Sequence, residues 1–282
     1  MEIVSTIDEL RQRTDDARCD GQIVGFVPTM GFLHAGHASL MSAARASSDV
    51  VVLSIFVNPL QFAADEDLST YPRDLERDSA LAEAHGVDLL FTPAVEEMYP
   101  QSVISEVSVP SLASKWDGAA RPSHFTGMAT VVAKLFSIVG PCQAFFGEKD
   151  FQQLRIVTRM VSDLSFPVKV VGCPIVREDD GLAMSSRNIY LKPAERTAAV
   201  VLRLALDVGL ALIVDGERDP GRVIYAMESV IHNELLAELD YATIVDVETL
   251  DVPTVLAGEV RLLIAAQVGR PRLIDNDGLV VV

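Results

Sequence analysis

Apolar runs alternate with helical patterns along about the first 170 residues of the chain. Strand-like apolar runs lie at 22–28, 50–57, 87–91, 144–146 and 166–171, a further apolar run lies at 130–139, and helical patterns lie at 37–47, 73–85 and 151–164. Because strands that alternate with helices build βαβ units, this order predicts a parallel, doubly wound (Rossmann-like) α/β sheet.

The pattern changes after Lys192. Two long helical stretches, at 193–216 and 220–239, are followed by strand-like segments at 241–250 and 260–269. The segment EDDGLAMSSRN before them is rich in polar and small residues, which is typical of a loop or hinge. We therefore expect a Rossmann-like domain over residues 1–177 and a smaller C-terminal α+β domain over residues 178–282.

The composition is close to that of soluble globular proteins, with 49% hydrophobic and 22% charged residues. We expect no membrane span, because no apolar run approaches the roughly 18 to 20 residues that cross a bilayer. Acidic residues near the start argue against a signal or transit peptide. The three cysteines form no CxxC or Cys/His cluster and fit a reducing cytosol, so a cytoplasmic location is expected.

The charge balance bears on the substrate. The chain has 23 basic and 40 acidic residues, a formal net charge of −17. Such a surface repels a polyanion unless its basic residues gather in one cleft, so a nucleic-acid partner is disfavoured. A small phosphate-bearing substrate needs only a local positive pocket.

The most informative segment is VPTMGFLHAGHASL at 27–40, which places His34 and His37 at a predicted strand-to-helix junction. Ligands of open α/β sheets bind at the carboxyl ends of strands, where a helix N-terminus favours anions. Two imidazoles there suit the charge that develops when a phosphoryl group is transferred. The alternatives are a metal site, which has no obvious third ligand, and half-buried histidines with satisfied hydrogen bonds.

The segment GEKDFQQL at 147–154 follows a strand-like run. Its glycine suits a tight strand-to-helix turn, Lys149 offers a mobile cation and Asp150 offers an acceptor. The alternative is that Lys149 is a solvated surface residue.

The loop MSSRN at 184–188 offers hydroxyls and a guanidinium to phosphate oxygens. Its alternative is a helix-capping serine pair. The segment RPSHF at 121–125, expected to be a short loop bounded by proline, is a minor clue.

Four amides, on Asn58, Gln61, Gln152 and Gln153, follow strand-like runs. Each offers two donors and an acceptor, which suits recognition of hydroxyl and carboxylate groups. The alternative is that they are ordinary surface amides.

Together the segments VPTMGFLHAGHASL, SIFVNPLQF, YPRDLERD, RPSHFTG, FFGEKDFQQL, DGLAMSSRN and RLIDN resemble the pantothenate synthetase family, the pantoate–β-alanine ligases. Their order and spacing agree with the family as far as Asn276. HxGH alone indicates only the nucleotidyltransferase superfamily that includes class I aminoacyl-tRNA synthetases, whereas GEKDFQQ with MSSR is specific to this family.

The resemblance implies an ATP-dependent reaction in two steps. The carboxylate of pantoate attacks the α-phosphorus of magnesium-bound ATP, which gives pantoyl adenylate and pyrophosphate, and the amine of β-alanine then displaces AMP. The implied partners are small molecules and a second subunit in a homodimer, and the C-terminal domain is expected to act as a lid. Two alternatives stay open: another HxGH adenylyltransferase with a different acid, and a nucleotide-binding regulator without turnover.

The resemblance also assigns site residues. His37, His34 and Lys149 are the implied catalytic residues, with Gln61 and Gln153 at pantoate and Gln61 also at β-alanine. For His37, a proton donor in the family, stabilisation of charge is favoured because a carboxylate nucleophile has no proton to lose. The implied ATP-binding residues are Met30, Gly31, Phe32, Leu33, His34, Ala35, Gly36, His37, Gly147, Glu148, Lys149, Asp150, Val176, Met184, Ser185, Ser186 and Arg187.

Three further residues carry weaker implications. Arg121 and His124 resemble family residues near the mouth of the active site. No protein ligand of magnesium is assigned, because the family binds this ion largely through the phosphates of ATP. Asp78 is the best acidic candidate for such a ligand.

Overall fold

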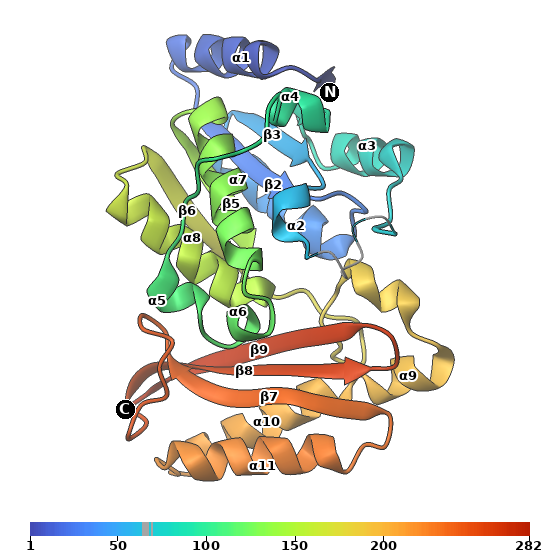
Figure 1. Ribbon diagram of the computed structural model, residues 1–282, viewed down its shortest axis with the longest axis vertical. Coiled ribbons are helices and arrows are strands. Elements are labelled where there is room, and N and C mark those ends of the chain that lie inside the picture. The colour runs from blue at the N-terminus through green and yellow to red at the C-terminus, as the bar shows by residue number, and fades with distance from the viewer. Residues whose placement is uncertain (64–67, 69) are drawn as a thin grey trace. The chain divides into compact units, whose positions relative to one another are not determined.

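The computed structural model describes residues 1–63, 68 and 70–282, and the chain divides into two compact units. The N-terminal unit comprises Met1–Ser114, Gly118–Glu148 and Ile156–Pro174. The C-terminal unit comprises Lys115–Asp117, Lys149–Arg155 and Ile175–Val282. Figure 1 colours both units by residue number.

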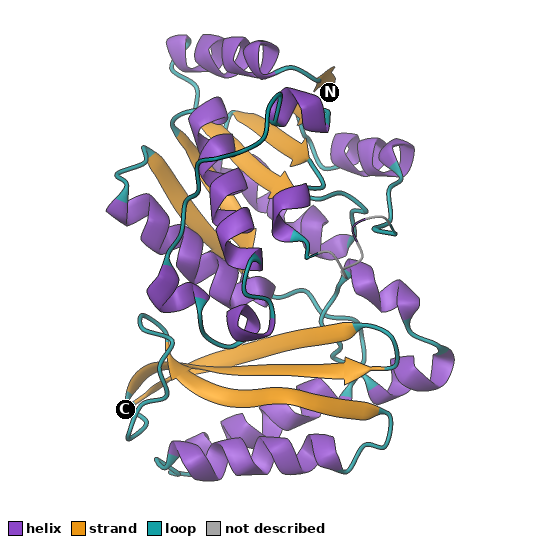
Figure 2. Cartoon of the chain, viewed as in Figure 1, coloured by secondary structure: helices purple, strands orange, loops and turns teal. Residues whose placement is uncertain are grey.

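The N-terminal unit contains a six-stranded sheet in which every pairing is parallel (Figure 2). Its strands are β1 (Glu2–Val4), β2 (Val24–Thr29), β3 (Val50–Ile55), β4 (Leu89–Phe91), β5 (Cys142–Gly147) and β6 (Val168–Cys173), in the spatial order β1-β4-β3-β2-β5-β6. From β2 the chain moves outward through β3 and β4, and β5 then returns to the other side of β2. This reversal confirms the predicted doubly wound sheet and puts a switch point at the carboxyl ends of β2 and β5.

Helices cover both faces of this sheet (Figure 1). They are α1 (Ile7–Cys19), α2 (Ala35–Ser47), α3 (Leu75–Ala84) and α7 (His124–Val139), with the short helices α4 (Val95–Met98) and α5 (Pro110–Ala113) and the 3₁₀ helix η1 (Pro59–Gln61). Helices α6 (Asp117–Ala120) and α8 (Phe151–Asp163) each include residues of both units. The side chains of β2 alternate between the faces, so Phe26 contacts Phe136 of α7 while Val27 joins a buried cluster with Met41 of α2.

The C-terminal unit contains a three-stranded antiparallel sheet of β7 (Ala237–Asp246), β8 (Gly258–Val268) and β9 (Arg272–Val281). Its helices are α9 (Pro193–Ala198), α10 (Val201–Val214), α11 (Pro220–His232) and the 3₁₀ helix η4 (Ser186–Tyr190). Leu202, Leu206 and Met227 of these helices form one buried core with Ile244 and Leu262 of the sheet. The predicted α+β character of this part is confirmed.

Several predicted boundaries differ from the structure. The helical stretch 193–216 is two helices, and the stretch 220–239 ends at His232 because β7 begins at Ala237. The apolar run 130–139 is helical, and His124 and Phe125, expected in a loop, begin α7. Strand β9 was not predicted, because Asp275, Asn276 and Asp277 interrupt its apolar pattern.

The expectation that no apolar run approaches membrane-spanning length is wrong for Pro193–Val214. By length and composition alone, this stretch of 22 residues is sufficient to cross a bilayer. In the structure it is divided between α9 and α10, and 44% of its apolar window is buried. Packing in the core of the C-terminal unit accounts for its apolar composition.

Candidate active site

The loop that follows β2 has an unusual backbone. Gly31 has φ of 83° and Phe32 has φ of 50°, so two consecutive residues adopt left-handed conformations. Thr29 fixes the start of the loop, since its hydroxyl donates to the carbonyl of Ser54 (2.8 Å) and accepts from the amide of Gly31 (3.2 Å). The loop therefore leaves β2 in one defined direction and leads into α2.

His34 and His37 cap the N-terminus of α2 reciprocally. The Nδ1 of His34 accepts from the amide of Gly36 (3.1 Å), and the Nδ1 of His37 accepts from the amide of His34 (3.3 Å). The ring centroids are 4.1 Å apart, and both side chains are half-buried. Because Nδ1 is the acceptor, each neutral ring carries its proton on Nε2, a donor suited to phosphate. The alternative interpretation, half-buried histidines with satisfied hydrogen bonds, is thus compatible with a catalytic role.

Asp78 lies on α3, and the residue is 1% exposed. Its two oxygens accept from the amides of Phe32 and Leu33, each at 2.7 Å. Burial, as the largest influence, raises the pKa of Asp78 above the ordinary value, and the hydrogen bonds from the two amides oppose that rise. Both carboxylate oxygens of Asp78 are therefore engaged with the backbone of the loop that follows β2. Among the described residues, no group of three or more histidine, cysteine or acidic side chains is placed to hold a metal ion.

A chain of buried amides begins at Gln61 in η1. The Nε2 of Gln61 lies 3.0 Å from the sulfur of Met30, the first residue of the predicted ATP segment. Its Oε1 accepts from Nδ2 of Asn58 (3.1 Å), which also donates to the carbonyl of Gly127 (3.1 Å). The Oδ1 of Asn58 accepts from the hydroxyl of Tyr99 (2.8 Å). The structure thus brings Gln61 next to the predicted nucleotide loop in a fixed orientation.

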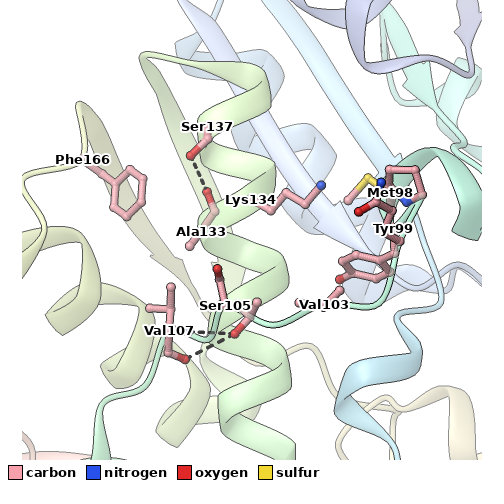
Figure 3. Close-up of a pocket in the computed structure, with 12 residues that line it drawn as sticks. Met98, Tyr99, Val103, Ser105, Val107, Ala133, Lys134, Ser137 and Phe166 are labelled. Carbon is pink, nitrogen blue, oxygen red and sulfur yellow. Dashed lines mark hydrogen bonds between the residues drawn. The ribbon is translucent and has the colours of Figure 1, made fainter.

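Tyr99 is a member of this network that the sequence analysis missed. Burial raises the pKa of Tyr99 to about 12, so its hydroxyl stays protonated and remains a donor to Asn58. The ring borders a cavity of about 480 Å³ (Figure 3), and the Nζ of Lys134 lies 5.6 Å from the ring centroid. No motif pointed to Tyr99, because its role depends on a partner 41 positions away.

The RPSHFTG segment brings α7 against η1. The Nδ1 of His124 lies 2.9 Å from the carbonyl oxygen of Gln61. Gly127 allows the close approach, since a Cβ there would lie 2.1 Å from the carbonyl oxygen of Leu60. Arg121, in the turn before α7, is half-buried. His124 therefore supports the backbone of a predicted substrate-binding residue.

The GEKD segment crosses the boundary between the two units. Gly147 and Glu148 belong to the N-terminal unit, where β5 ends beside β2, and Lys149 and Asp150 belong to the C-terminal unit. The Nζ of Lys149 lies 3.5 Å from the carboxylate of Asp150.

In the C-terminal unit, the backbone at Lys149 is held from β9. Its carbonyl accepts from Nδ2 of Asn276 (2.8 Å), and the Oδ1 of Asn276 accepts from Nε of Arg261 (2.7 Å). Asn276 is buried, and so it fixes the position of Lys149 while leaving the ammonium group on a flexible side chain.

Asp275, which precedes Asn276 in β9, binds next to a second predicted ATP segment, the one that contains Val176 and Met184. Asp275 is buried and forms a bidentate ion pair with Arg177 (2.6 and 3.0 Å). Arg177 follows Val176, whose carbonyl accepts from the amide of Met184 (3.0 Å). Within this unit, β9 thus anchors both Lys149 and the segment that carries Val176 and Met184.

The MSSR segment leads into η4. Ser185 caps this helix by accepting from the amide of Arg187 (3.3 Å), which confirms the capping interpretation for this serine. Met184, Ser186 and Arg187 are half-buried, and the structure leaves their proposed contact with phosphate untested.

The two adjacent glutamines of α8 have different environments. Gln152 is buried, donates to the carbonyl of Lys115 (2.8 Å) and accepts from the amide of Asp117 (3.1 Å). Gln153 is half-buried, and the described part of the chain gives its side chain no hydrogen bond. Gln152 is a structural residue, and Gln153 is the one suited to a ligand.

The chain is similar to known ligases over nearly its whole length. A family model described as pantoate-beta-alanine ligase matches residues 2–278. A pantothenate synthetase of Brucella anthropi is 52% identical over 277 residues, which cover 98% of this chain and 96% of the relative. The chain belongs to the pantoate–β-alanine ligase family. It is therefore an enzyme of pantothenate biosynthesis.

Solved structures of pantoate–β-alanine ligases share the fold. The crystal structure of pantothenate synthetase from Thermus thermophilus has a TM-score of 0.93 and 48% identity, and covers 98% of this chain and 99% of that one. The pantoate-beta-alanine ligase of Francisella tularensis, complexed with beta-gamma ATP and beta-alanine, has a TM-score of 0.80 and 32% identity, covering 98% of this chain and 97% of that one. The likeness includes the α/β sheet and the small antiparallel sheet of the ligase fold.

The substitution Gly127→Ala tests whether the close approach of α7 to η1 keeps Gln61 in position in this ligase. The added Cβ must push α7 away from η1, so we expect destabilisation by about 1–3 kcal/mol and a raised KM for pantoate. Urea unfolding and steady-state kinetics measure the two effects. The matched control is Gly221→Ala in α11, where a Cβ meets only the carboxylate of Asp219 at 3.2 Å. Equal effects of the two substitutions would contradict the role of the close approach.

The substitution Asp275→Asn tests the ion pair by which β9 binds Arg177. It leaves the largely buried guanidinium of Arg177 without its bidentate carboxylate, so we expect a loss of about 3 kcal/mol in the free energy of unfolding. Asp251→Asn is the control, because its ion pair with Lys115 is largely exposed on the carboxylate side and is worth about 0–1 kcal/mol. If the Asp275 variant has wild-type stability in denaturant titrations, the ion pair with Arg177 does not stabilise the unit and the prediction is wrong.

Proposed function

We propose that this enzyme condenses pantoate with β-alanine through a pantoyl adenylate, with ATP as the activating substrate. The observation that carries the proposal is the HxGH pair, two Nε2 donors at a helix N-terminus where the strand order of a doubly wound sheet reverses. Membership of the ligase family and the nucleotide and β-alanine named for the Francisella tularensis relative support it.

In the first step, a carboxylate oxygen of pantoate forms a bond to the α-phosphorus of ATP, and the bond to the bridging oxygen of pyrophosphate breaks. Negative charge grows on the α-phosphate and on the leaving group. We assign its stabilisation to His34, His37 and Lys149, since imidazole N–H and ammonium groups that are already oriented cost little reorganisation. No proton leaves the nucleophile, so His37 acts as a donor of a hydrogen bond rather than as a base.

In the second step, the neutral amine of β-alanine forms a bond to the acyl carbon, and the bond from that carbon to the phosphate oxygen of AMP breaks. AMP leaves with the electron pair of that bond, and the proton lost by the amine nitrogen is released to solvent. Gln61 is suited to both substrates because it is buried and oriented by Asn58. We assign Gln61 to pantoate and β-alanine, and Gln153 to pantoate. The enzyme's contribution here is orientation of the amine and exclusion of water.

The remaining ATP contacts are proposed for Met30–His37, Gly147–Asp150, Val176 and Met184–Arg187. We propose that Mg²⁺ arrives bound to the phosphates of ATP, and that Asp78, whose two oxygens each accept a backbone amide, serves the loop instead. We also propose a homodimer in the cytoplasm, with a nucleotide- and pantoate-binding domain over 1–177 and a lid domain over 178–282. Two buried cysteine thiols, Cys142 and Cys173, are consistent with a reducing compartment.

The substitution His37→Ala tests the role of the imidazole pair. We expect the pantoate-dependent exchange of pyrophosphate into ATP to slow by about 10²-fold or more, the scale for loss of one transition-state donor. His232→Ala, at the exposed end of α11, is the control and should keep the wild-type rate. A near wild-type single-turnover rate in the His37 variant would exclude the proposed role, and exchange with other small acids in place of pantoate would redirect the substrate assignment.

The substitution Gln61→Ala tests the substrate amide. We expect KM for pantoate and for β-alanine to rise about tenfold, because a lost hydrogen bond to a charged group weakens binding on that scale. The KM for ATP should stay within about twofold. Release of AMP, measured with each substrate varied in turn, gives these values, and Gln12→Ala on α1 serves as a surface control. A large loss of ATP affinity would contradict the assignment.

A further inference from the structure

The nucleotide loop 30–34 is held from outside by two consecutive residues of α3, a helix that contacts α2 in the same unit (Figure 1). Asp78 accepts the amides of Phe32 and Leu33 through separate oxygens, each at 2.7 Å. Arg77 donates through Nη2 to the carbonyl of Leu33 (2.9 Å). One helix therefore binds both the donor and the acceptor of the Leu33 backbone.

These contacts fix the part of the loop whose backbone conformation is unusual. Phe32 has a left-handed backbone that residues other than glycine rarely adopt, so an external constraint has to maintain it. The guanidinium of Arg77 lies 4.9 Å from the centroid of the Phe32 ring and covers one side of it. A Cβ on Gly31 would lie only 3.1 Å from the carboxylate of Asp78. Gly31 thus leaves the space that the carboxylate requires to reach the two amides.

The loop determines where the imidazoles lie. Leu33 is fully buried and directly precedes His34, which is the N-cap of α2 and contacts His37 through backbone and ring. A change in the backbone at Phe32 and Leu33 would move the N-cap and, with it, both Nε2 donors. The geometry of the anion-binding end of α2 is therefore set from α3.

We propose that Asp78, assisted by Arg77, is a positioning residue for the nucleotide loop and controls the use of ATP rather than of pantoate or β-alanine. The proposal rests on the assignment of His34 and His37 to ATP made above. It differs from a metal-ligand role for Asp78, because the carboxylate acts on backbone amides and is needed whether or not Mg²⁺ is present.

The test uses the full-length enzyme with Asp78→Asn, which keeps the shape of the side chain and replaces one acceptor by a donor that opposes an amide. We expect KM for ATP to rise about tenfold or more and pyrophosphate exchange to slow by a similar factor, while KM for β-alanine stays within about twofold. Arg77→Gln, a substitution at an exposed position, should shift KM for ATP in the same direction by about threefold. Glu76→Gln, the exposed neighbour on α3, is the control and should change nothing.

Binding of a non-hydrolysable ATP analogue, measured by calorimetry in EDTA, separates positioning from metal binding. Weaker binding by the Asp78 variant in EDTA supports the proposal. Normal binding in EDTA with a defect that appears only when Mg²⁺ is added would overturn it in favour of a metal ligand. A lower melting temperature with unchanged KM for ATP in both variants would also overturn it, since that is the result of a purely structural role.

The same assays distinguish this inference from the proposed function. If His37→Ala abolishes exchange while Asp78→Asn and Arg77→Gln keep the wild-type KM for ATP, the positioning role alone is wrong. If His37→Ala leaves exchange intact, the assignment of the imidazoles to ATP is wrong, and the positioning role fails with it.

Discussion

The reversal of strand order between β2 and β5 is the constraint on which the candidate site residues of the N-terminal unit depend. The connections that follow β2 and β5 lead to opposite sides of the sheet order. The carboxyl end of β2 is therefore left uncovered by the segment that connects β2 to β3. Helix α2 begins there, with its amides unsatisfied by helical partners and its positive dipole end toward the same edge. The histidines provide the capping that serine and glutamate usually provide, and so place two imidazoles at the helix end that we propose as the phosphate site.

Both units secure their functional segments by the same physical means. Most buried polar side chains in proteins are hydrogen-bonded, and four of those in this chain have partners on the segments of the candidate site. Asp78 binds the nucleotide loop, and Asn58 binds Gln61. In the C-terminal unit, Asp275 binds Arg177 beside Val176, and Asn276 binds the carbonyl of Lys149. These positioning groups do not compete for substrate, because their polar atoms are already engaged.

The sequence predicted much of this arrangement. Strands β2 to β6 and helices α2, α3 and α8 follow local periodicity, since a strand or helix buried on a defined face needs apolar residues at regular spacing. The HxGH pair, GEKD and MSSR are contiguous, so they were recognisable without coordinates, and the family followed from them. The sequence did not predict β9, whose centre is Asp275, Asn276 and Asp277, because local pattern treats a run of polar residues as exposed.

The chain by itself therefore determined the class of fold, the order of most of its elements and the candidate residues for the chemistry. Only the tertiary structure decided which of those residues are fixed in position, and which buried side chains bind them. The pair of Asp78 with Leu33 joins positions 45 apart, Arg177 with Asp275 joins positions 98 apart, and Asn276 with Lys149 joins positions 127 apart. The physical reason is that burial of a charge or an amide depends on a partner brought from elsewhere by folding, and local spacing contains no information about that partner.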